Sequence, residues 1–205
     1  MPRNGFDRIA PFYDHLVWLF FGNQIQKSQT FFLPSIPPRA KVLVMGGGTG
    51  WIIPRIMTAQ PNCRIWFIDS SMEMIRRAKA RNPDNRAVIY IPGTSSDVPK
   101  EKFDIVILPF FLDLFSPHNL KENLLTLSWS TTSSTQWFVT DFVDHGKWWE
   151  RILLTWMYLF FGLTCSIEAR RLPPWQRLLE NLDFKRQQSR VFYNGFIESN
   201  FYLRN

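Results

Sequence analysis

Short apolar runs alternate with helix-patterned segments through the middle of the chain. The apolar runs are rich in β-branched and aromatic residues and predict strands at 41–45, 64–68, 87–91, 105–108 and 136–140. They are continuously apolar, which is typical of strands buried on both faces of a parallel sheet. The segments between them predict helices at 51–60, 71–81 and 117–127. This order predicts an α/β fold in which helices cover a parallel sheet.

Both ends of the chain depart from this alternation. Residues 1–36 form an aromatic-rich segment with helical patterning, and 148–163 and 173–182 predict two further helices. The closing runs 184–192 and 197–203 are separated by Tyr193-Asn194-Gly195. Because Asn-Gly favours a tight turn between antiparallel strands, we expect a terminal β-hairpin.

A glycine-rich loop follows the first expected strand, in the run Met45-Gly46-Gly47-Gly48-Thr49-Gly50-Trp51. The dinucleotide fingerprint G-x-G-x-x-G fails here, because its third glycine would fall on Trp51 or Ile53. The pattern that fits is G-x-G-x-G, from Gly46, Gly48 and Gly50. Glycines at such a turn let a ligand approach the main chain closely.

An acidic residue follows the second expected strand, since Asp69 stands 19 residues after Gly50. A carboxylate at that point can accept hydrogen bonds from both ribose hydroxyls of a nucleoside. The alternative is that Asp69 only caps the helix that begins near Ser71. The glycine loop at the right distance upstream favours the nucleoside interpretation.

Four stretches of the chain are similar to the motifs of one enzyme family. They are Phe6-Asp-Arg-Ile-Ala-Pro-Phe-Tyr-Asp14 beside F-D-x-x-A-x-x-Y-D, Val42-Leu-Val-Met-Gly-Gly-Gly-Thr-Gly50 beside V-L-D-L-G-C-G-T-G, Phe67-Ile-Asp-Ser-Ser-Met-Glu-Met-Ile75 beside G-x-D-x-S-x-x-M-L, and Pro92-Gly-Thr-Ser-Ser-Asp-Val-Pro99 with Phe103-Asp-Ile-Val106 beside G-D-A-x-x-L-P and F-D-V-V. The chain therefore resembles the class I S-adenosylmethionine-dependent methyltransferases, in particular those of the ubiquinone/menaquinone-biosynthesis type.

The resemblance implies a Rossmann-like fold with a seven-stranded, mostly parallel sheet, helices on both faces, an antiparallel C-terminal hairpin and an aromatic helical lid. It implies S-adenosyl-L-methionine as the cofactor and methyl transfer as the reaction. We expect one domain over residues 1–205, because this length fits a single domain. Its expected parts are a helical preface or lid (1–36), a cofactor-binding core (37–145), substrate-covering helices (146–182) and the hairpin (183–205).

Carried over residue by residue, the resemblance assigns a role to each part of the site. The residues implied at the amino-acid end of the cofactor are Gly46, Gly47, Gly48, Thr49 and Gly50. Those implied at the nucleoside and the methionine are Asp69 for the ribose, Ser70 and Met74 beside the adenine, Thr94 and Ser95 at its edge, and Leu108 near the methionine moiety. Tyr13 is implied to lie over the methyl group.

Two positions depart from the family pattern. Val44 replaces the acidic residue that stands two positions before the first glycine, which removes a support for the ammonium group of the cofactor. Thr94 replaces the aspartate that would accept the adenine amino group. These losses motivate an alternative from another class, a cofactor-binding or interaction module without catalysis.

Aromatic residues make up 16% of the chain and are concentrated in two segments. These are Phe12, Tyr13, Trp18, Phe20 and Phe21 in the preface, and Trp148, Trp149, Trp156, Tyr158, Phe160 and Phe161 in the helix predicted at 148–163. A pocket lined by such rings suits a small hydrophobic acceptor, aromatic or lipid-like, for O- or C-methylation. The alternative is that the rings fill the core. The late helix is apolar nearly all round, so it must be buried on several sides or touch lipid.

Removal of a proton from the acceptor requires a base near the methyl group. His145 follows the fifth expected strand, close to Asp141 and Asp144, and is the best-placed candidate, with a structural loop role as the alternative. His15 is second, and His118 is expected on a helix surface. The spacing of Asp141, Asp144 and His145 matches no metal motif, so no metal is expected.

The net charge of +7 raises nucleic acid and anionic membranes as partners. We expect no nucleic-acid role, because no recognition motif is present and Leu108-Pro-Phe-Phe111 stands where base methyltransferases carry N/D-P-P-Y/F. Peripheral membrane contact stays open, and no oligomeric state is favoured. No leader pattern is present, the longest apolar stretch has 14 residues and the two cysteines lie far apart, which favours a cytoplasmic setting.

Overall fold

A computed structural model describes residues 5–83, 85–165 and 167–204. Residues 1–4 of the expected preface lie outside these ranges. The strands are β1 Lys41–Met45, β2 Arg64–Asp69, β3 Val88–Pro92, β4 Ile105–Pro109, β5 Gln136–Phe142, β6 Phe184–Phe192 and β7 Ile197–Arg204. They form a seven-stranded sheet in the order β3-β2-β1-β4-β5-β7-β6, in which β7 is antiparallel to both of its neighbours. The expected Rossmann-like methyltransferase fold is therefore confirmed.

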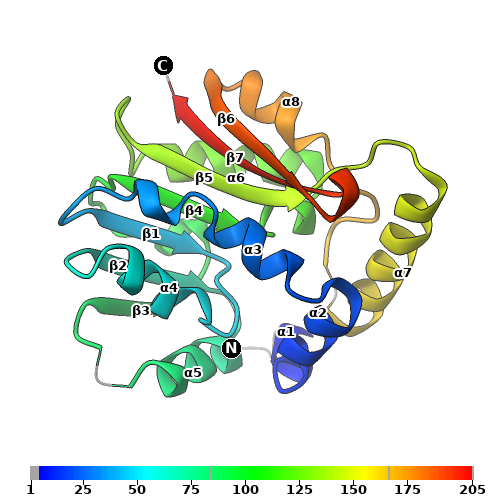
Figure 1. The fold of residues 1–205 in the computed structure, drawn as a ribbon, viewed down its shortest axis with the longest axis horizontal. Coiled ribbons are helices and arrows are strands. Elements are labelled where there is room, and N and C mark those ends of the chain that lie inside the picture. The colour runs from blue at the N-terminus through cyan, green and yellow to red at the C-terminus, as the bar shows by residue number, and fades with distance from the viewer. Residues whose placement is uncertain (1–4, 84, 166, 205) are drawn as a thin grey trace.

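Helices cover both faces of this sheet (Figure 1). They are α1 Gly5–Ile9, α2 Tyr13–Phe21, α3 Gln24–Thr30, α4 Ile52–Ala59, α5 Met72–Arg81, α6 Pro117–Ser128, α7 Trp148–Cys165 and α8 Trp175–Glu180. Successive residues of β1 supply opposite faces, because side chains alternate along a strand. Val42 and Val44 pack with α4 and α5, whereas Leu43 and Met45 pack with α6 and α8.

A third apolar cluster lies at the end of the sheet to which the parallel strands point (Figure 1). Phe21 of α2, Ile25 of α3 and Leu154 of α7 meet Phe142 and Ile197 there. The preface and α7 thus close the carboxyl edge of the sheet, where an open α/β fold binds its ligands. In the described part of the chain, no helix is both long and apolar enough to cross a membrane.

Local chemistry accounts for most element ends. Ser71 caps α5 by accepting a hydrogen bond from the Met74 amide, and Asn194 and Gly195 adopt the left-handed backbone that the expected hairpin turn needs. The largest difference from expectation is at 173–182, where only Trp175–Glu180 is helical. Pro174 stands at its N-cap, and a proline disfavours the helical conformation of the residue before it, so the helix starts late.

Two glycine substitutions are expected to change stability in opposite directions. Gly50→Ala places a Cβ 2.5 Å from Ala78 Cβ of α5, on a left-handed backbone with φ of +73°, and should lower the free energy of unfolding by about 2–4 kcal/mol. Gly162→Ala, within α7 and with open space around the new Cβ, should raise it by about 0.5–1 kcal/mol. Urea denaturation measures both, and equal effects would contradict the packing described.

Candidate active site

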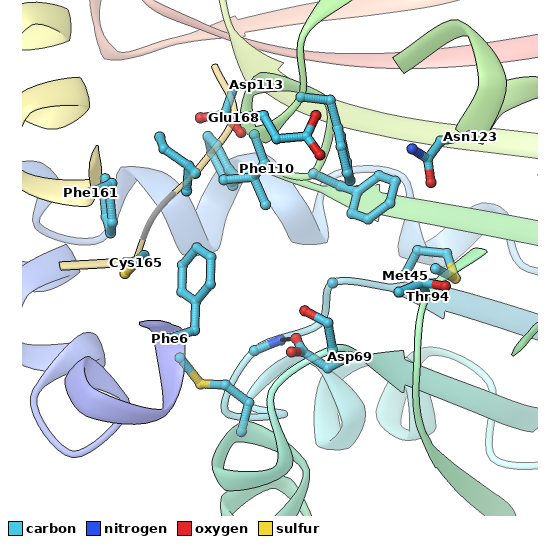
Figure 2. Close-up of a pocket in the computed structure, with 18 of the residues that line it drawn as sticks. Phe6, Met45, Asp69, Thr94, Phe110, Asp113, Asn123, Phe161, Cys165 and Glu168 are labelled. Atoms are coloured by element: carbon cyan, nitrogen blue, oxygen red, sulfur yellow. Dashed lines mark hydrogen bonds between the residues drawn. The ribbon is translucent and has the colours of Figure 1, made fainter. Parts of the chain in front are cut away.

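A cavity of about 540 Å³ lies at the carboxyl edge of the sheet, between the glycine loop and the helices of the preface and α7. Figure 2 shows Asp69, Thr94 and Phe6 on one side, with Asp113 and Glu168 on the opposite side. The expected site residues that line it are Tyr13, Gly46, Gly48, Asp69, Ser70, Met74, Thr94 and Ser95. Gly47 and Thr49 border a smaller adjoining hollow. The structure therefore brings eight of the sequence-predicted residues together.

The glycine loop needs glycine at successive positions for different reasons. A Cβ on Gly47 would lie 2.1 Å from the Phe67 ring, so this position is closed by the core. Gly46 and Gly48 have left-handed φ values of +66° and +60°. A Cβ on Gly48 would point toward Tyr13, 3.9 Å away, and would occupy space that a ligand could take. Gly50 lies behind the loop against α5, where it fixes the loop and does not line the cavity.

Asp69 joins the glycine loop to the start of α5. Its Oδ2 accepts a hydrogen bond from the Gly48 amide at 2.9 Å, and its Oδ1 accepts one from the Ser71 amide at 2.9 Å. Each carboxylate oxygen keeps a further lone pair for a ligand hydroxyl. Burial raises the pKa of Asp69 to about 6, so the group is mostly ionised at neutral pH. Asp69 can therefore hydrogen-bond the start of α5 and still accept hydrogen bonds from the hydroxyl groups of a ribose.

The adenine side of the expected site is more polar than the sequence suggested. The Thr94 amide and hydroxyl both donate to Asp97 Oδ2, so the threonine caps a short 3-10 turn. Ser95 donates its hydroxyl to Asn123 Oδ1 at 2.7 Å. Asn123, on α6, also lines the cavity and was not expected from the sequence. It offers an amide near the position where Thr94 replaces the family's aspartate.

The preface is held over the cavity by two aspartates. Asp7 Oδ1 accepts hydrogen bonds from the Ser71 hydroxyl at 2.6 Å and the Glu73 amide at 3.2 Å, at the start of α5. Asp14 accepts from the Thr49 hydroxyl at 2.7 Å and from Arg81 Nη2 at 2.6 Å. These contacts give the stretch 6–14 a physical role, since they fasten α1 and α2 to the glycine loop and α5.

Tyr13 lies between these two fastenings and lines the cavity. Burial, together with the neighbouring carboxylates of Asp113, Asp69 and Asp14, raises the pKa of the Tyr13 hydroxyl above its usual value. The phenol therefore stays protonated at neutral pH and can act as a hydrogen-bond donor or an aromatic wall.

A pair of buried carboxyl groups lies at the ends of β4 and β5. Asp141 is fully buried and accepts hydrogen bonds from the amides of Leu112, Asp113 and Phe142. Asp113 follows β4 and lines the cavity, and its Oδ1 has no hydrogen-bond partner among the described residues. One signal for Asp113 is present in the sequence: it stands just past an expected strand, at the ligand-binding edge of the sheet.

Burial raises the pKa of Asp141 to about 7, and burial together with the charge of Asp141 raises that of Asp113 well above its usual range. Since the three amides favour the ionised form of Asp141, Asp113 is the member that holds a proton. Asp113, which lines the cavity, is thus the carboxyl group of this pair that binds a proton more readily.

His145 lies apart from the cavity. It is exposed, its Nε2 is 3.1 Å from the Gly195 carbonyl oxygen, and its amide donates to Glu150 Oε2. His118 is exposed and pairs with Glu122 at 3.3 Å. Leu108, expected near the methionine moiety, is fully buried in the core, and Phe110, just after the end of β4, lines the cavity instead.

The cavity is acidic although the chain as a whole is basic. The acidic side chains that line it among the described residues are Asp69, Asp113, Glu122 and Glu168, and no described lysine, arginine or histidine lines it. Val44 is fully buried in the core and does not reach the cavity. Glu168 and Asp113 supply carboxyl groups on the far side (Figure 2). Such a cavity suits a cationic ligand, and a sulfonium with an ammonium group fits it.

Disconnecting the preface should expose it to protease. Replacing Asp7 and Asp14 together by alanine removes two fastenings, each worth about 1 kcal/mol for partly exposed groups, and should speed cleavage within residues 5–36 about tenfold. Limited proteolysis followed by mass spectrometry measures this. Asp144→Ala, in an exposed loop, is the matched control, and equal cleavage of the two variants would contradict the fastening role.

Comparison with known proteins gives a consistent result. A family model described as "Methyltransferase domain" matches residues 42–128, from β1 to the end of α6. A search of curated proteins gives no significant match.

Solved structures share the fold at low sequence identity. A chain in the complex between the Haloferax volcanii Trm112 methyltransferase activator and the putative methyltransferase is 11% identical, with a TM-score of 0.76 over 99% of both chains. DhpI with SAH is 16% identical, with a TM-score of 0.74 over 97% of this chain and 93% of that one.

Human N-acetylserotonin methyltransferase with SAM is 17% identical, with a TM-score of 0.70 over 96% of this chain. The present chain spans only 55% of the human protein. Residues 42–128 thus match a methyltransferase domain, and the seven-stranded sheet has the Rossmann-like methyltransferase fold.

Proposed function

We propose that the protein transfers the methyl group of S-adenosylmethionine to an oxygen or carbon atom of a small hydrophobic acceptor, aromatic or lipid-like. The observation that supports this is the composition of the cavity. Beyond the glycine loop it is walled by apolar side chains of α2 and α7, including Val17, Phe21, Met157 and Phe161. Asp113 lines the cavity beside that apolar region, and its buried Oδ1 has no hydrogen-bond partner among the described residues.

The cofactor supplies an electrophilic methyl group on a positively charged sulfur. The glycine loop, Asp69, Ser70 and Met74 are the groups that would hold it, and the acidic walls favour its charge. Transfer requires the acceptor atom, the methyl carbon and the sulfur to lie in line, and such alignment can supply about 7–11 kcal/mol in favourable cases. Tyr13 and the apolar walls would position the acceptor and exclude water.

Asp113 is the base in this proposal. For a hydroxyl acceptor, the Asp113 carboxylate would take the proton as the acceptor oxygen bonds to the methyl group that the cofactor would supply. The electron pair of the broken carbon–sulfur bond would stay on the sulfur of the cofactor. A raised pKa makes the carboxylate a stronger base toward a phenol, at the cost of a smaller ionised fraction at neutral pH. His145 lies outside the cavity wall, so the proposal assigns the proton to Asp113.

The motifs in residues 6–14 and 67–75 support an acceptor of the ubiquinone/menaquinone-precursor class, a ring with an alkyl chain. Human N-acetylserotonin methyltransferase, which shares the fold, is named for a small-molecule acceptor. We propose a cytoplasmic setting, in which the buried Cys63 and Cys165 remain thiols.

Cofactor binding should strengthen with pH through the ionisation of Asp69. With a pKa of about 6, this carboxyl is roughly one-tenth ionised at pH 5, so the Kd for S-adenosylmethionine should fall about tenfold between pH 5 and 7.5. Asp69→Asn should bind more weakly and lose most of this dependence, whereas Asp144→Asn should behave as the native protein. Calorimetric titration measures all three, and a pH-independent native Kd would contradict this role of Asp69.

Asp113→Asn should lower kcat about 100-fold or more, the usual contribution of a general base, while the Kd for S-adenosylmethionine stays unchanged. The native rate should rise with pH above neutrality as Asp113 ionises, and the variant should lose this rise. Methylation of a panel of apolar phenols and quinols, followed by mass spectrometry, measures the rates.

Asp113→Asn should have a higher free energy of unfolding than the native protein at pH 8, and this difference should be smaller at pH 5. A carboxyl group whose pKa is higher in the folded than in the unfolded state destabilises the native fold as pH rises, and the variant lacks this contribution from Asp113. Thermal or urea unfolding at the two pH values measures the difference.

Unchanged turnover in Asp113→Asn would show that Asp113 is not the base. Tight cofactor binding without turnover of any acceptor would instead favour the non-catalytic module.

A further inference from the structure

The outer face of α7 is apolar and exposed. We define it by Trp148, Ile152, Trp156, Leu159 and Leu163, whose exposed fractions run from 51% to 77%. These residues recur every three or four positions, so they lie along one side of the helix. A monomeric soluble protein rarely exposes a continuous row of large apolar side chains, and such a row usually marks an interaction surface.

The inner face of the same helix holds it to the body of the protein. Leu154 is buried in the third apolar cluster, and Met157 and Phe161 line the cavity. Glu150 is fully buried, where Oε2 accepts the His145 amide at 2.8 Å and Oε1 lies 3.2 Å from Lys147 Nζ. The helix is therefore held in place by its inner face, and its outer face stays exposed in the folded protein.

The preface adds exposed apolar side chains at the same end of the molecule. Trp18, Leu19 and Phe20 of α2 are 67%, 69% and 51% exposed. Val17 and Phe21, on the other side of α2, pack in the same apolar cluster as α7. Figure 1 shows α2 and α7 at the end of the sheet away from the C-terminus. Both helices thus have apolar residues on inner and outer faces.

A basic groove runs beside the outer face. It has a volume of about 950 Å³ and is lined by Leu159 and other apolar residues together with Arg151, Arg170 and Arg171. All three arginines are exposed, and none makes an ion pair with a described residue. Asp144 is the acidic residue of this groove within the described chain, and its Oδ1 accepts the Gly146 amide.

We propose that the outer face of α7 and its basic groove dock on an anionic lipid bilayer. Tryptophan and leucine side chains suit the interfacial region of a membrane, because an indole combines an apolar body with a polar N–H group. Unpaired guanidinium groups bind phosphate and the negative surface of anionic lipids. In this arrangement α7 lies along the membrane surface with the cavity directly behind it.

Two features favour a bilayer over a second copy of the chain. A two-fold symmetric contact through this face would bring the same arginine-bearing surface of both copies together, and like charges repel. The row on α7 is long and one-sided, as expected for a helix that lies in the plane of a membrane interface. The positive net charge of the chain adds to the attraction.

Vesicle co-sedimentation tests the proposal without cofactor or acceptor, so its outcome is independent of the proposed activity. Vesicles of phosphatidylcholine with about 30% phosphatidylglycerol should sediment the native protein, and vesicles of phosphatidylcholine alone should sediment much less. The double variant Trp156→Ser and Leu163→Ser should lower the partition coefficient at least tenfold. The control Leu125→Ser and Trp129→Ser, which removes exposed apolar side chains at α6, should leave it unchanged.

The contribution of the positive charges of the groove is tested with the double variant Arg170→Gln, Arg171→Gln. These changes should reduce binding to the anionic vesicles several-fold and leave weak binding to neutral vesicles as it was. Lys100→Gln with Lys121→Gln removes the same charge from exposed positions elsewhere and should have a smaller effect. Unchanged thermal unfolding of the four double variants keeps a loss of binding interpretable.

Three results would overturn the proposal. The first is equal sedimentation of the native protein and the Trp156→Ser, Leu163→Ser variant, and the second is no sedimentation of the native protein with anionic vesicles. The third is a native dimer in light scattering that the same variant dissociates, which would assign the face to a second copy of the chain.

Discussion

The site depends on the hydrogen bonds of one buried carboxylate. Asp69 connects the glycine loop after β1 to the start of α5, through the amides of Gly48 and Ser71. The Ser71 hydroxyl in turn donates a hydrogen bond to the Asp7 carboxylate of the preface, and it caps α5 by accepting one from the Met74 amide. A loop of glycines has many accessible conformations, so this carboxylate selects one of them and places the loop, the helix and the lid relative to each other. The cavity is the space left between these three parts.

Helix α7 separates two opposite electrostatic environments. Toward the inside, the described charged residues lining the cavity are acidic, which suits a cofactor with a positive sulfur. Toward the outside, an exposed apolar face is bordered by three arginines that form no ion pair with any described residue. The net charge of +7 therefore describes neither surface well, because acidic side chains line the cavity and basic side chains lie on the outer surface. In the proposed arrangement, lipid meets the outer surface of α7, and the cavity lies behind its inner surface.

The strands and their order were largely predictable from sequence, because buried parallel strands are continuous apolar runs and the glycine loop marks the ligand-binding edge. The same logic placed Asp69 beside the cavity, and the family resemblance implied Ser70 and Met74 there. It did not find Glu168 or Asn123, whose places depend on how α6 and the segment after α7 pack. It favoured His145 from its position after β5, but the loop turns outward to bond Gly195. Asp113 was equally close to a strand end, and only its burial distinguishes it.

The fastening of the preface has a consequence for the order in which the protein folds. Asp7 bonds Ser71 across a sequence separation of 64 residues, and Asp14 bonds Arg81 across 67. Contacts between distant residues bear a larger loop-closure entropy than the neighbouring β1, α4 and β2 contacts. The sheet and α5 can therefore assemble before α1 and α2 attach to them. On this route the glycine loop takes its shape first, and the walls that shield it from water close last.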